Sequence, residues 1–325
     1  MIKYTEYDLE AAKKLDDFLP DKIFDAHMHI SMYPFCGMKQ FGFTDYKKDM
    51  FPLFSNRYLR CVALATPTNE LKSPEGHLNT INFFSEQLDA NPDCVGSILV
   101  KPEESYEEIL SHIANPKIVG LKCYHTYAKR EPTSDADVHE YLSDTALEIA
   151  DKYNMTVTIH LVKDRALSDP ANMREIKEIA QRYPNAKIVL AHAARSFASW
   201  TAIESVSELI PYENVFFDFS AICESPAIIR ILKKIGISRC MWGSDYNVST
   251  LLGKAISLGE GFYWIDEEDI ERIKQKSIIR PRHIIVENLM AIREAGIICD
   301  LSASDVENLF YNNACKVFSK TTAQN

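Results

Sequence analysis

The feature that most constrains the fold of this chain is a regular alternation of short, β-branched apolar runs with longer amphipathic stretches. The runs predict strands at residues 22–30, 59–66, 94–101, 118–125, 156–162, 186–192, 215–220 and 239–246. The stretches between them predict helices at 74–91, 102–115, 135–153, 169–183, 196–209 and 225–235. Such alternation favours parallel strands joined by right-handed crossovers, and eight strands predict a closed (β/α)8 barrel.

The length of 325 residues suits one barrel domain. We predict an N-terminal helix within residues 1–21, the barrel at 22–247 and a C-terminal helical segment at 248–325. Within that last segment, residues 259–282 are expected over or beside the barrel mouth, and 304–318 are expected to form a closing helix. A doubly wound sheet is disfavoured because no Gly-rich phosphate turn follows the first strand.

Charge and cysteine usage limit the partners and the compartment. The net charge of −10 disfavours nucleic acid and anionic membranes as partners, and no apolar run is long enough to cross a bilayer. No secretory signal is seen at the start, and the eight cysteines are scattered without a C-x-x-C pair, so we expect reduced thiols in the cytoplasm. The expected partner is a small-molecule substrate, and a homodimer is the oligomer expected from general frequency.

Residues able to bind a metal gather at the predicted carboxyl ends of the strands. They are His27 and His29 on the first strand, Lys122 and His125 on the fourth, His160 on the fifth, His192 on the sixth and Asp245 on the eighth. In a (β/α)8 barrel these ends meet at one mouth, where active sites form.

The alternation of side chains refines this picture. Asp25, His27 and His29 share one predicted face of the first strand, and the apolar residues between them suit the helix layer. Both imidazoles are therefore expected to face the lumen. Lys122 and His125 are an odd number of positions apart, so only one can face inward on a regular strand, and we favour Lys122.

Imidazole and carboxylate ligands suit Zn²⁺ or a similar divalent ion in an open site. Such an ion lowers the pKa of a bound water towards ~7, and a neighbouring carboxylate or imidazole can then move the proton.

At these residues the sequence resembles the amidohydrolase superfamily, and within it the amidohydrolase-2 group of hydrolases, lactonases and metal-dependent aromatic-acid decarboxylases. The resemblance runs from the Phe-Asp-Ala-His-Met-His segment at 24–29, through Ile-His at 159–160, Leu-Ala-His at 190–192 and Trp-Gly-Ser-Asp-Tyr at 242–246, to Asn-Asn-Ala-Cys-Lys-Val-Phe at 312–318. Many superfamily members carry an added β-sandwich, but too few residues precede the first strand here to build one. The resemblance thus implies a distorted TIM barrel without a sandwich domain.

The resemblance also implies roles. His27, His29, His160 and Asp245 would hold one Zn²⁺ or Mn²⁺, His192 would position or polarise water or join the ligands, and Asp245 would serve as general base. The Gly-Leu-Lys-Cys-Tyr segment at 120–124 is similar to a fourth-strand lysine segment of dihydroorotase-like members, whose lysine is carboxylated and bridges two metals. One ion is favoured, and a carboxylated Lys122 would bring a second; unmodified, Lys122 would act on a substrate oxyanion or carboxylate.

The other polar residues give weaker indications. His125 and Arg195 are candidate substrate-binding residues, and together with Lys122 and Arg130 they hint at an anionic substrate. Asp218 is a candidate support for the metal ligands. No role is assigned to the histidines in or near predicted helices, which are His77, His112, His139 and His283.

Three functions remain open at this stage. The first is a metal-dependent hydrolase acting on an amide, ester or lactone carbonyl. The second is a metal-dependent, non-oxidative decarboxylase of an aromatic or unsaturated carboxylic acid. The third is a metal-binding protein without catalysis.

Overall fold

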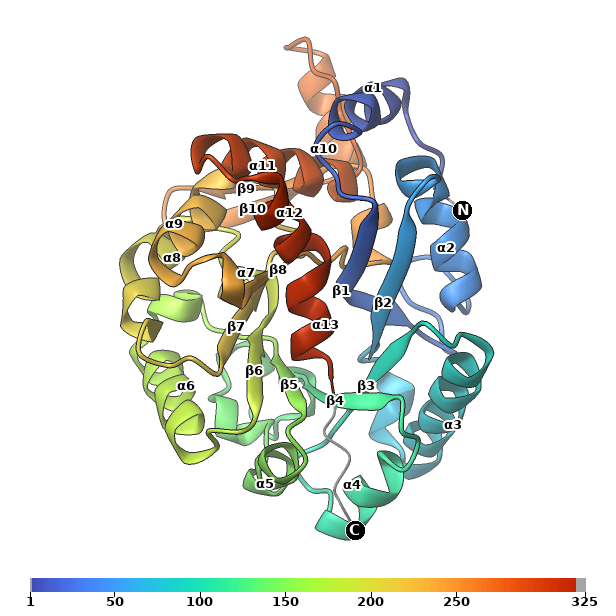
Figure 1. The fold of residues 1–325 in the computed structure, drawn as a ribbon, viewed down its shortest axis with the longest axis vertical. Coiled ribbons are helices and arrows are strands. Elements are labelled where there is room, and N and C mark those ends of the chain that lie inside the picture. Colours follow the sequence, from blue (N-terminus) through green and yellow to red (C-terminus); the bar gives the residue numbers. More distant parts are fainter. Residues whose placement is uncertain (1, 320–325) are drawn as a thin grey trace.

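Eight parallel strands follow one another in chain order around a barrel in the computed structural model, which describes residues 2–319 (Figure 1). The strands are β1 (Lys22–Ile30), β2 (Tyr58–Ala65), β3 (Val95–Leu99), β4 (Ile118–Cys123), β5 (Thr156–Ile159), β6 (Lys187–Leu190), β7 (Val215–Asp218) and β8 (Cys240–Met241). All neighbouring pairs from β1 to β8 are parallel. The predicted (β/α)8 barrel is confirmed, and no added sandwich domain is evident in the described residues.

The barrel closes through the chain that follows β8 rather than through β8 itself. The Ala26 amide donates to the Trp242 carbonyl over 3.0 Å, and the Asp245 amide donates to the His27 carbonyl over 2.7 Å. Met28 and Tyr246 form a further parallel bridge. The segment carrying Asp245 is therefore fixed directly against β1, the strand that carries His27 and His29.

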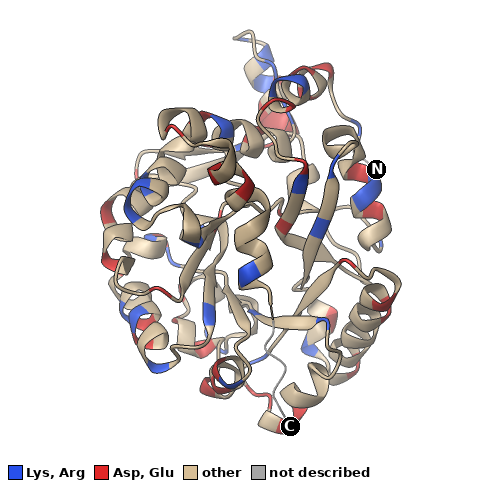
Figure 2. Ribbon diagram, in the orientation of Figure 1, with Lys and Arg blue, Asp and Glu red and all other residues tan. Residues whose placement is uncertain are grey.

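Helices surround the barrel and cover its outer face. They are α1 (Glu6–Leu15), α2 (Phe43–Phe54), α3 (Pro74–Ala90), α4 (Tyr106–His112), α5 (Asp144–Lys152), α6 (Pro170–Arg182), α7 (Ala191–Arg195), α8 (Trp200–Ser205), α9 (Ser225–Ile235), α10 (Glu267–Lys274), α11 (Ile284–Ile298), α12 (Ala303–Glu307) and α13 (Asn313–Val317). Several begin at the side-chain caps that such helices favour, as at Ser73 before α3 and Asp169 before α6. Acidic and basic residues are interspersed along the outer helices (Figure 2).

The apolar core has an inner and an outer part. The inner cluster includes Phe24, Val62 and Met241 from the strands. Val317 of α13 joins it, as does Phe318 directly after that helix, whose ring lies 6.1 Å from that of Phe24. Phe24 is near the start of β1, so α13 closes the end of the barrel opposite the mouth. The outer and larger cluster joins the strands to the helices around them. The mouth is thus the one end left for polar chemistry.

The C-terminal segment differs from the purely helical segment that the sequence predicts. It contains an antiparallel hairpin formed by β9 (Lys254–Leu258) and β10 (Gly261–Ile265). Phe262 and Trp264 of this hairpin each lie with ring centroids 5.0 Å from that of Phe197, in the loop after β6. The hairpin therefore lies beside the mouth, where residues 259–282 are predicted to lie.

Two further expectations bear on the environment of the chain. No helix among the described residues is long and apolar enough to span a membrane. All eight cysteines are free thiols, although the Cys61 and Cys94 sulfurs lie only 3.3 Å apart.

Candidate metal centre at the barrel mouth

The predicted phase of β1 is wrong at Asp25. This side chain faces α2, where the Tyr46 hydroxyl donates to Asp25 Oδ2 over 2.7 Å, while Phe24 and Ala26 belong to the inner cluster. The pairing register between β1 and β2 shifts between Asp25 and Met28, and this irregularity lets Ala26 and His27 both face inward. The two imidazoles reach the mouth as expected, but by way of a bulge that sequence alternation does not reveal.

Four predicted ligands meet at the mouth. His27 Nε2 lies 3.3 Å from His29 Nε2, and each of these nitrogens lies 3.5 Å from Asp245 Oδ1. His192 offers a nitrogen within 4.8 Å of the ligand atoms of His27 and Asp245. All four side chains are buried. Spacings of this size match ligand atoms arranged around one ion with bonds of about 2.0–2.2 Å.

The remaining ring nitrogens hold two of these imidazoles in the required orientation. His27 Nδ1 lies 3.0 Å from Asp218 Oδ2, and His192 Nδ1 lies 3.1 Å from the Ser220 carbonyl. Burial lowers the pKa of His27 to about 4, while the adjoining imidazoles outweigh burial and hold the pKa of Asp218 well below its usual range. At neutral pH a neutral His27 therefore donates from Nδ1 to an ionised Asp218, and Nε2 is left free for a ligand bond.

The backbone around two of the candidate ligands is unusual. His192, Ala193, Ala194 and Arg195 have φ values of 55°, 51°, 60° and 59°, so α7 includes a left-handed turn of non-glycine residues. Asp245 also has a positive φ, of 57°. Each such residue costs of the order of 1–2 kcal/mol, and concentrated strain of this kind is typical of functional sites.

His160 lies at the edge of the group rather than in its centre. Its ring lies 5.0 Å from the His192 ring and 5.4 Å from the Tyr124 ring, on which it stacks. Its Nδ1 has no hydrogen-bond partner among the described residues. Burial and the neighbouring cationic groups lower its pKa, so the ring is neutral and its Nδ1 is available to a ligand. Its predicted place among the metal ligands stays a prediction.

Lys122 is a buried cation inside the barrel. Its side chain is fully buried, and its Nζ has no hydrogen-bond partner in the described part of the chain. The ammonium lies 4.5 Å from the centroid of the Tyr124 ring, and burial lowers its pKa to about 8. Leu121 and Cys123 pack in the outer cluster, so Lys122 points into the lumen as predicted.

His125 lies near the same group despite its odd spacing from Lys122. The strand ends at Cys123, and a 3₁₀ turn (His125–Tyr127) follows it, so the alternation of a regular strand no longer applies. The His125 ring lies 6.1 Å from the His160 ring, and its Nδ1 lies 3.1 Å from the Thr133 hydroxyl. His125 is half-buried and keeps its other nitrogen for a ligand.

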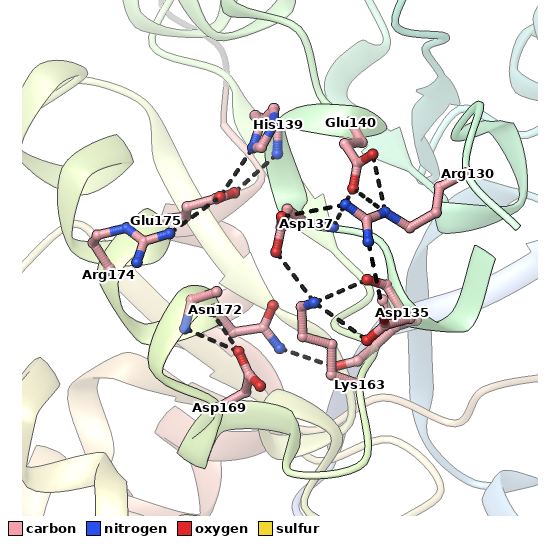
Figure 3. A network of polar contacts seen from close by, with 12 residues as sticks. Arg130, Asp135, Asp137, His139, Glu140, Lys163, Asp169, Asn172, Arg174 and Glu175 are labelled. Carbon is pink, nitrogen blue, oxygen red and sulfur yellow. Dashed lines mark hydrogen bonds and ion pairs between the residues drawn. The ribbon is translucent and has the colours of Figure 1, made fainter. Parts of the chain in front are cut away.

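The two arginines proposed from the sequence have different surroundings. Arg195 Nη1 donates to the Lys163 carbonyl over 2.9 Å, its guanidinium lies 5.2 Å from the centroid of the Phe262 ring, and no carboxylate pairs with it among the described residues. Arg130 instead pairs with Glu140 over 2.8 Å, within the network of Figure 3. Arg130 thus already has a carboxylate partner, and its predicted part in binding an anionic substrate stays a prediction.

The network of Figure 3 joins the loops that follow β4 and β5. Lys163 Nζ lies 3.1 Å from Asp137 and 3.4 Å from Asp135, and the Lys163 amide donates to the Ser134 carbonyl. Since one loop follows His125 and the other follows His160, these contacts fix the rim beside both histidines. Sequence reasoning missed this network, and it also missed Tyr124 and Ser220.

The donor set fits a divalent ion. Three imidazoles and one carboxylate converge, and His27 and His192 each have Nδ1 engaged, which leaves Nε2 available. Lys122 lies in the same lumen, and a carbamate formed on its Nζ from carbon dioxide would supply the two oxygens of a bridging ligand. The geometry thus accommodates one ion with the residues as they stand.

Comparison with known proteins agrees with this arrangement. The amidohydrolase family model matches residues 24–320, so the chain belongs to the amidohydrolase family. An L-fucono-1,5-lactonase of Burkholderia ambifaria is 27% identical over 188 residues, a match that covers 53% of this chain and 61% of the relative.

Two solved structures share the fold at low sequence identity. A zinc-bound amidohydrolase from Burkholderia multivorans has a TM-score of 0.59 and 12% identity, with 92% of this chain and 99% of that chain covered. A 5-carboxyvanillate decarboxylase from Sphingomonas paucimobilis has a TM-score of 0.56 and 13% identity, with 93% and 100% covered.

Proposed function

We propose that this protein is a metal-dependent hydrolase that directs water onto the carbonyl carbon of an amide, ester or lactone. The observation that carries the proposal is the convergence of His27 Nε2, His29 Nε2 and Asp245 Oδ1 within 3.3–3.5 Å of one another at the barrel mouth. The lactonase relative supports a lactone as the first substrate class to test. We infer that one Zn²⁺ or Mn²⁺ binds at the mouth of each barrel. We also infer that the protein is cytoplasmic and acts on a small molecule.

His27, His29, His192 and Asp245 would hold the ion, with His160 completing the set from the edge. A divalent ion supplies Lewis acidity there, which polarises a carbonyl and makes water nucleophilic at neutral pH. Burial raises the pKa of Asp245, but the imidazoles beside it, led by His192, outweigh burial and lower it, so the carboxylate is ionised. Asp245 can then accept the proton from the attacking water.

Lys122, His125 and Arg195 are proposed to face the substrate. Arg195 lacks a carboxylate partner among the described residues, and Lys122 lacks any hydrogen-bond partner there, so a substrate carboxylate or developing oxyanion would satisfy both. Intact-mass measurement under carbon dioxide separates this role from carboxylation of Lys122. An unmodified mass with one ion per mouth supports the proposal, whereas a carbon dioxide adduct with two ions contradicts it.

The decisive experiment pairs metal content with turnover. The protein would be purified, stripped with chelator, reloaded with Zn²⁺ or Mn²⁺ and assayed on sugar lactones, aryl esters and N-acyl amino acids. We expect activity to follow the ion and to be lost in His27→Ala and Asp245→Asn, while His139→Ala, which changes an exposed histidine, retains it. Wild-type activity in His27→Ala would overturn the proposal, and bound metal without turnover would favour the non-catalytic alternative.

A second function, non-oxidative decarboxylation, is favoured by one observation. The buried ammonium of Lys122 requires an anionic partner, and a substrate carboxylate in the lumen would provide it. Release of carbon dioxide from a panel of hydroxylated aromatic acids would identify this reaction. If no carbon dioxide is released and lactones or esters are hydrolysed, the hydrolase is the function that remains.

A further inference from the structure

A second group of metal-binding side chains lies in the outer layer of the barrel. His77 is in the first turn of α3, Glu104 is in the loop between β3 and α4, and His112 is the last residue of α4. His77 Nε2 lies 3.0 Å from Glu104 Oε1, and His112 Nδ1 lies 2.9 Å from the same oxygen. None of these residues belongs to the centre at the mouth.

The three side chains are almost withdrawn from water. The exposed fractions of the His77, Glu104 and His112 side chains are 5%, 5% and 14%. Glu104 Oε2 is already occupied, because it accepts from the Lys101 amide. Burial raises the pKa of Glu104, but the two imidazoles and this amide outweigh it and bring the pKa to about 2. The carboxylate is therefore ionised and fixed between two imidazole nitrogens.

The orientation of His112 is not that of a simple hydrogen-bonded pair. Its Nδ1 is buried and lies 2.9 Å from Glu104 Oε1, yet it has no hydrogen bond of acceptable geometry to any described residue. The two atoms are close without the alignment of a hydrogen bond, and a small separation would place them as two ligands of one ion. Two imidazoles and a carboxylate also form a donor set that zinc prefers.

We propose that His77, Glu104 and His112 bind a second divalent cation, with Zn²⁺ as the preferred ion. In a tetrahedral site with bonds of about 2.0 Å, ligand atoms lie about 3.3 Å apart, so both imidazole nitrogens need to move a few tenths of an ångström away from Glu104 Oε1. The more exposed edge of His112 leaves the fourth position for water. The ion would join α3 to the β3–α4 loop and to the end of α4.

A further group of metal-binding side chains, formed by Asp137, His139 and Glu175, differs from this buried cluster in two respects. It contains one imidazole rather than two, and the His139 side chain is 70% exposed. A histidine paired with Glu175 in this way needs no ion. The inference therefore rests on the buried cluster alone.

The test counts the ions bound by a mouth-disabled protein, a variant in which two candidate ligands at the barrel mouth have been substituted. In the double variant His27→Ala, Asp245→Asn, titration with one equivalent of Co²⁺ is expected to give one bound ion with the visible absorption of tetrahedral Co²⁺. Adding Glu104→Gln or His112→Ala should abolish it, and adding Glu107→Gln, an exposed acid on α4, should not. In the otherwise wild-type protein, Glu104→Gln should lower the zinc content by one ion.

Several outcomes would overturn the proposal. Failure of the mouth-disabled protein to bind Co²⁺ would do so, as would unchanged binding after His112→Ala. The fold of each variant is checked by circular dichroism. If Glu104→Gln does not fold, the Co²⁺ titration of the mouth-disabled protein and of its His112→Ala derivative still decides the question, because His112 ends its helix near the surface.

Discussion

His27 Nδ1 lies 3.0 Å from Asp218 Oδ2, and both side chains are fully buried. Asp218 Oδ1 meanwhile accepts from the His192 amide over 3.0 Å. One carboxylate at the end of β7 thus orients an imidazole from β1 and the backbone of the loop after β6. Asp218 binds no ion in this arrangement, but it controls the direction of two residues that would.

Replacing Asp218 with Asn is therefore expected to weaken metal binding at the mouth by about 10–100-fold. The Asn side chain keeps the shape but removes the charge that holds the proton on His27 Nδ1. Competition titration with a chromophoric chelator measures the change. Asp144→Asn, which alters an exposed acid paired with Arg182, is the matched control and should bind as the wild type does. Equal affinities in the two variants would refute this role.

Lys122→Met should stabilise the protein while it removes activity. The unpaired ammonium is fully buried, and Met fills a similar volume without charge, so we expect a gain of about 1–2 kcal/mol in the free energy of unfolding at pH 7. Urea denaturation and a turnover assay with an anionic substrate check the two effects. A destabilised variant would show that Lys122 has a partner that supports the fold.

The same lysine predicts a dependence of stability on pH. Its folded-state pKa of about 8 is below the unfolded value of 10.5, so the unfolded chain binds more protons between these values. The destabilisation is complete below pH 8 and is relieved as the pH rises towards 10.5. The difference in stability between Lys122→Met and wild type should therefore shrink between pH 8 and pH 10. A constant difference across this window would contradict the assigned pKa.

Gly243→Ala should disturb the mouth without replacing any candidate ligand. An added methyl would lie 2.6 Å from His27 Cβ and 3.0 Å from the His27 amide nitrogen, so β1 must shift. We expect a loss of about 1–3 kcal/mol in stability together with weaker metal binding. Gly261→Ala on the hairpin is the control, because its nearest contact is the Leu258 carbonyl at 3.8 Å. Similar effects of the two substitutions would argue against close packing at Gly243.

The lowered pKa of Glu104 predicts that this residue stabilises the metal-free protein and that the stabilisation is lost in acid. Its folded-state pKa of about 2 is below the reference value of 4.5, so its stabilisation is present above pH 4.5 and is lost as the pH falls towards 2. The difference corresponds to about 3 kcal/mol. The stability gap between wild type and Glu104→Gln, measured by urea denaturation in chelator, should close over this range. A gap independent of pH would exclude an ionised Glu104 as its cause.

Much of the barrel could be predicted because apolar residues repeat along the sequence with a different period in strands and in helices. The predicted and observed bounds agree within three residues for β1 to β7, and β8 is the exception. The predicted run at 239–246 forms only Cys240–Met241, and the residues after it contact β1 through separate hydrogen bonds at Trp242 and Asp245. Helix α2 was not predicted, and it contains Pro52 in its interior, a residue that sequence patterns associate with helix ends.

The side chains that meet because parallel strands end at one mouth could be predicted from the sequence. Those whose positions depend on local irregularities of the backbone could not. His27, His29, His192 and Asp245 come together because parallel strands share one mouth. Asp25 was placed on the wrong face because a bulge is invisible to alternation. His77 and His112 meet through Glu104 across three separate segments, and no spacing in the sequence indicates such a contact.

The left-handed turn at His192–Arg195 limits how this protein can change over evolution. A candidate metal ligand and a candidate substrate cation are at its two ends, and all four of its residues have positive φ. An insertion or deletion within the turn would displace both side chains at once. The length of this loop is therefore constrained by both side chains at once.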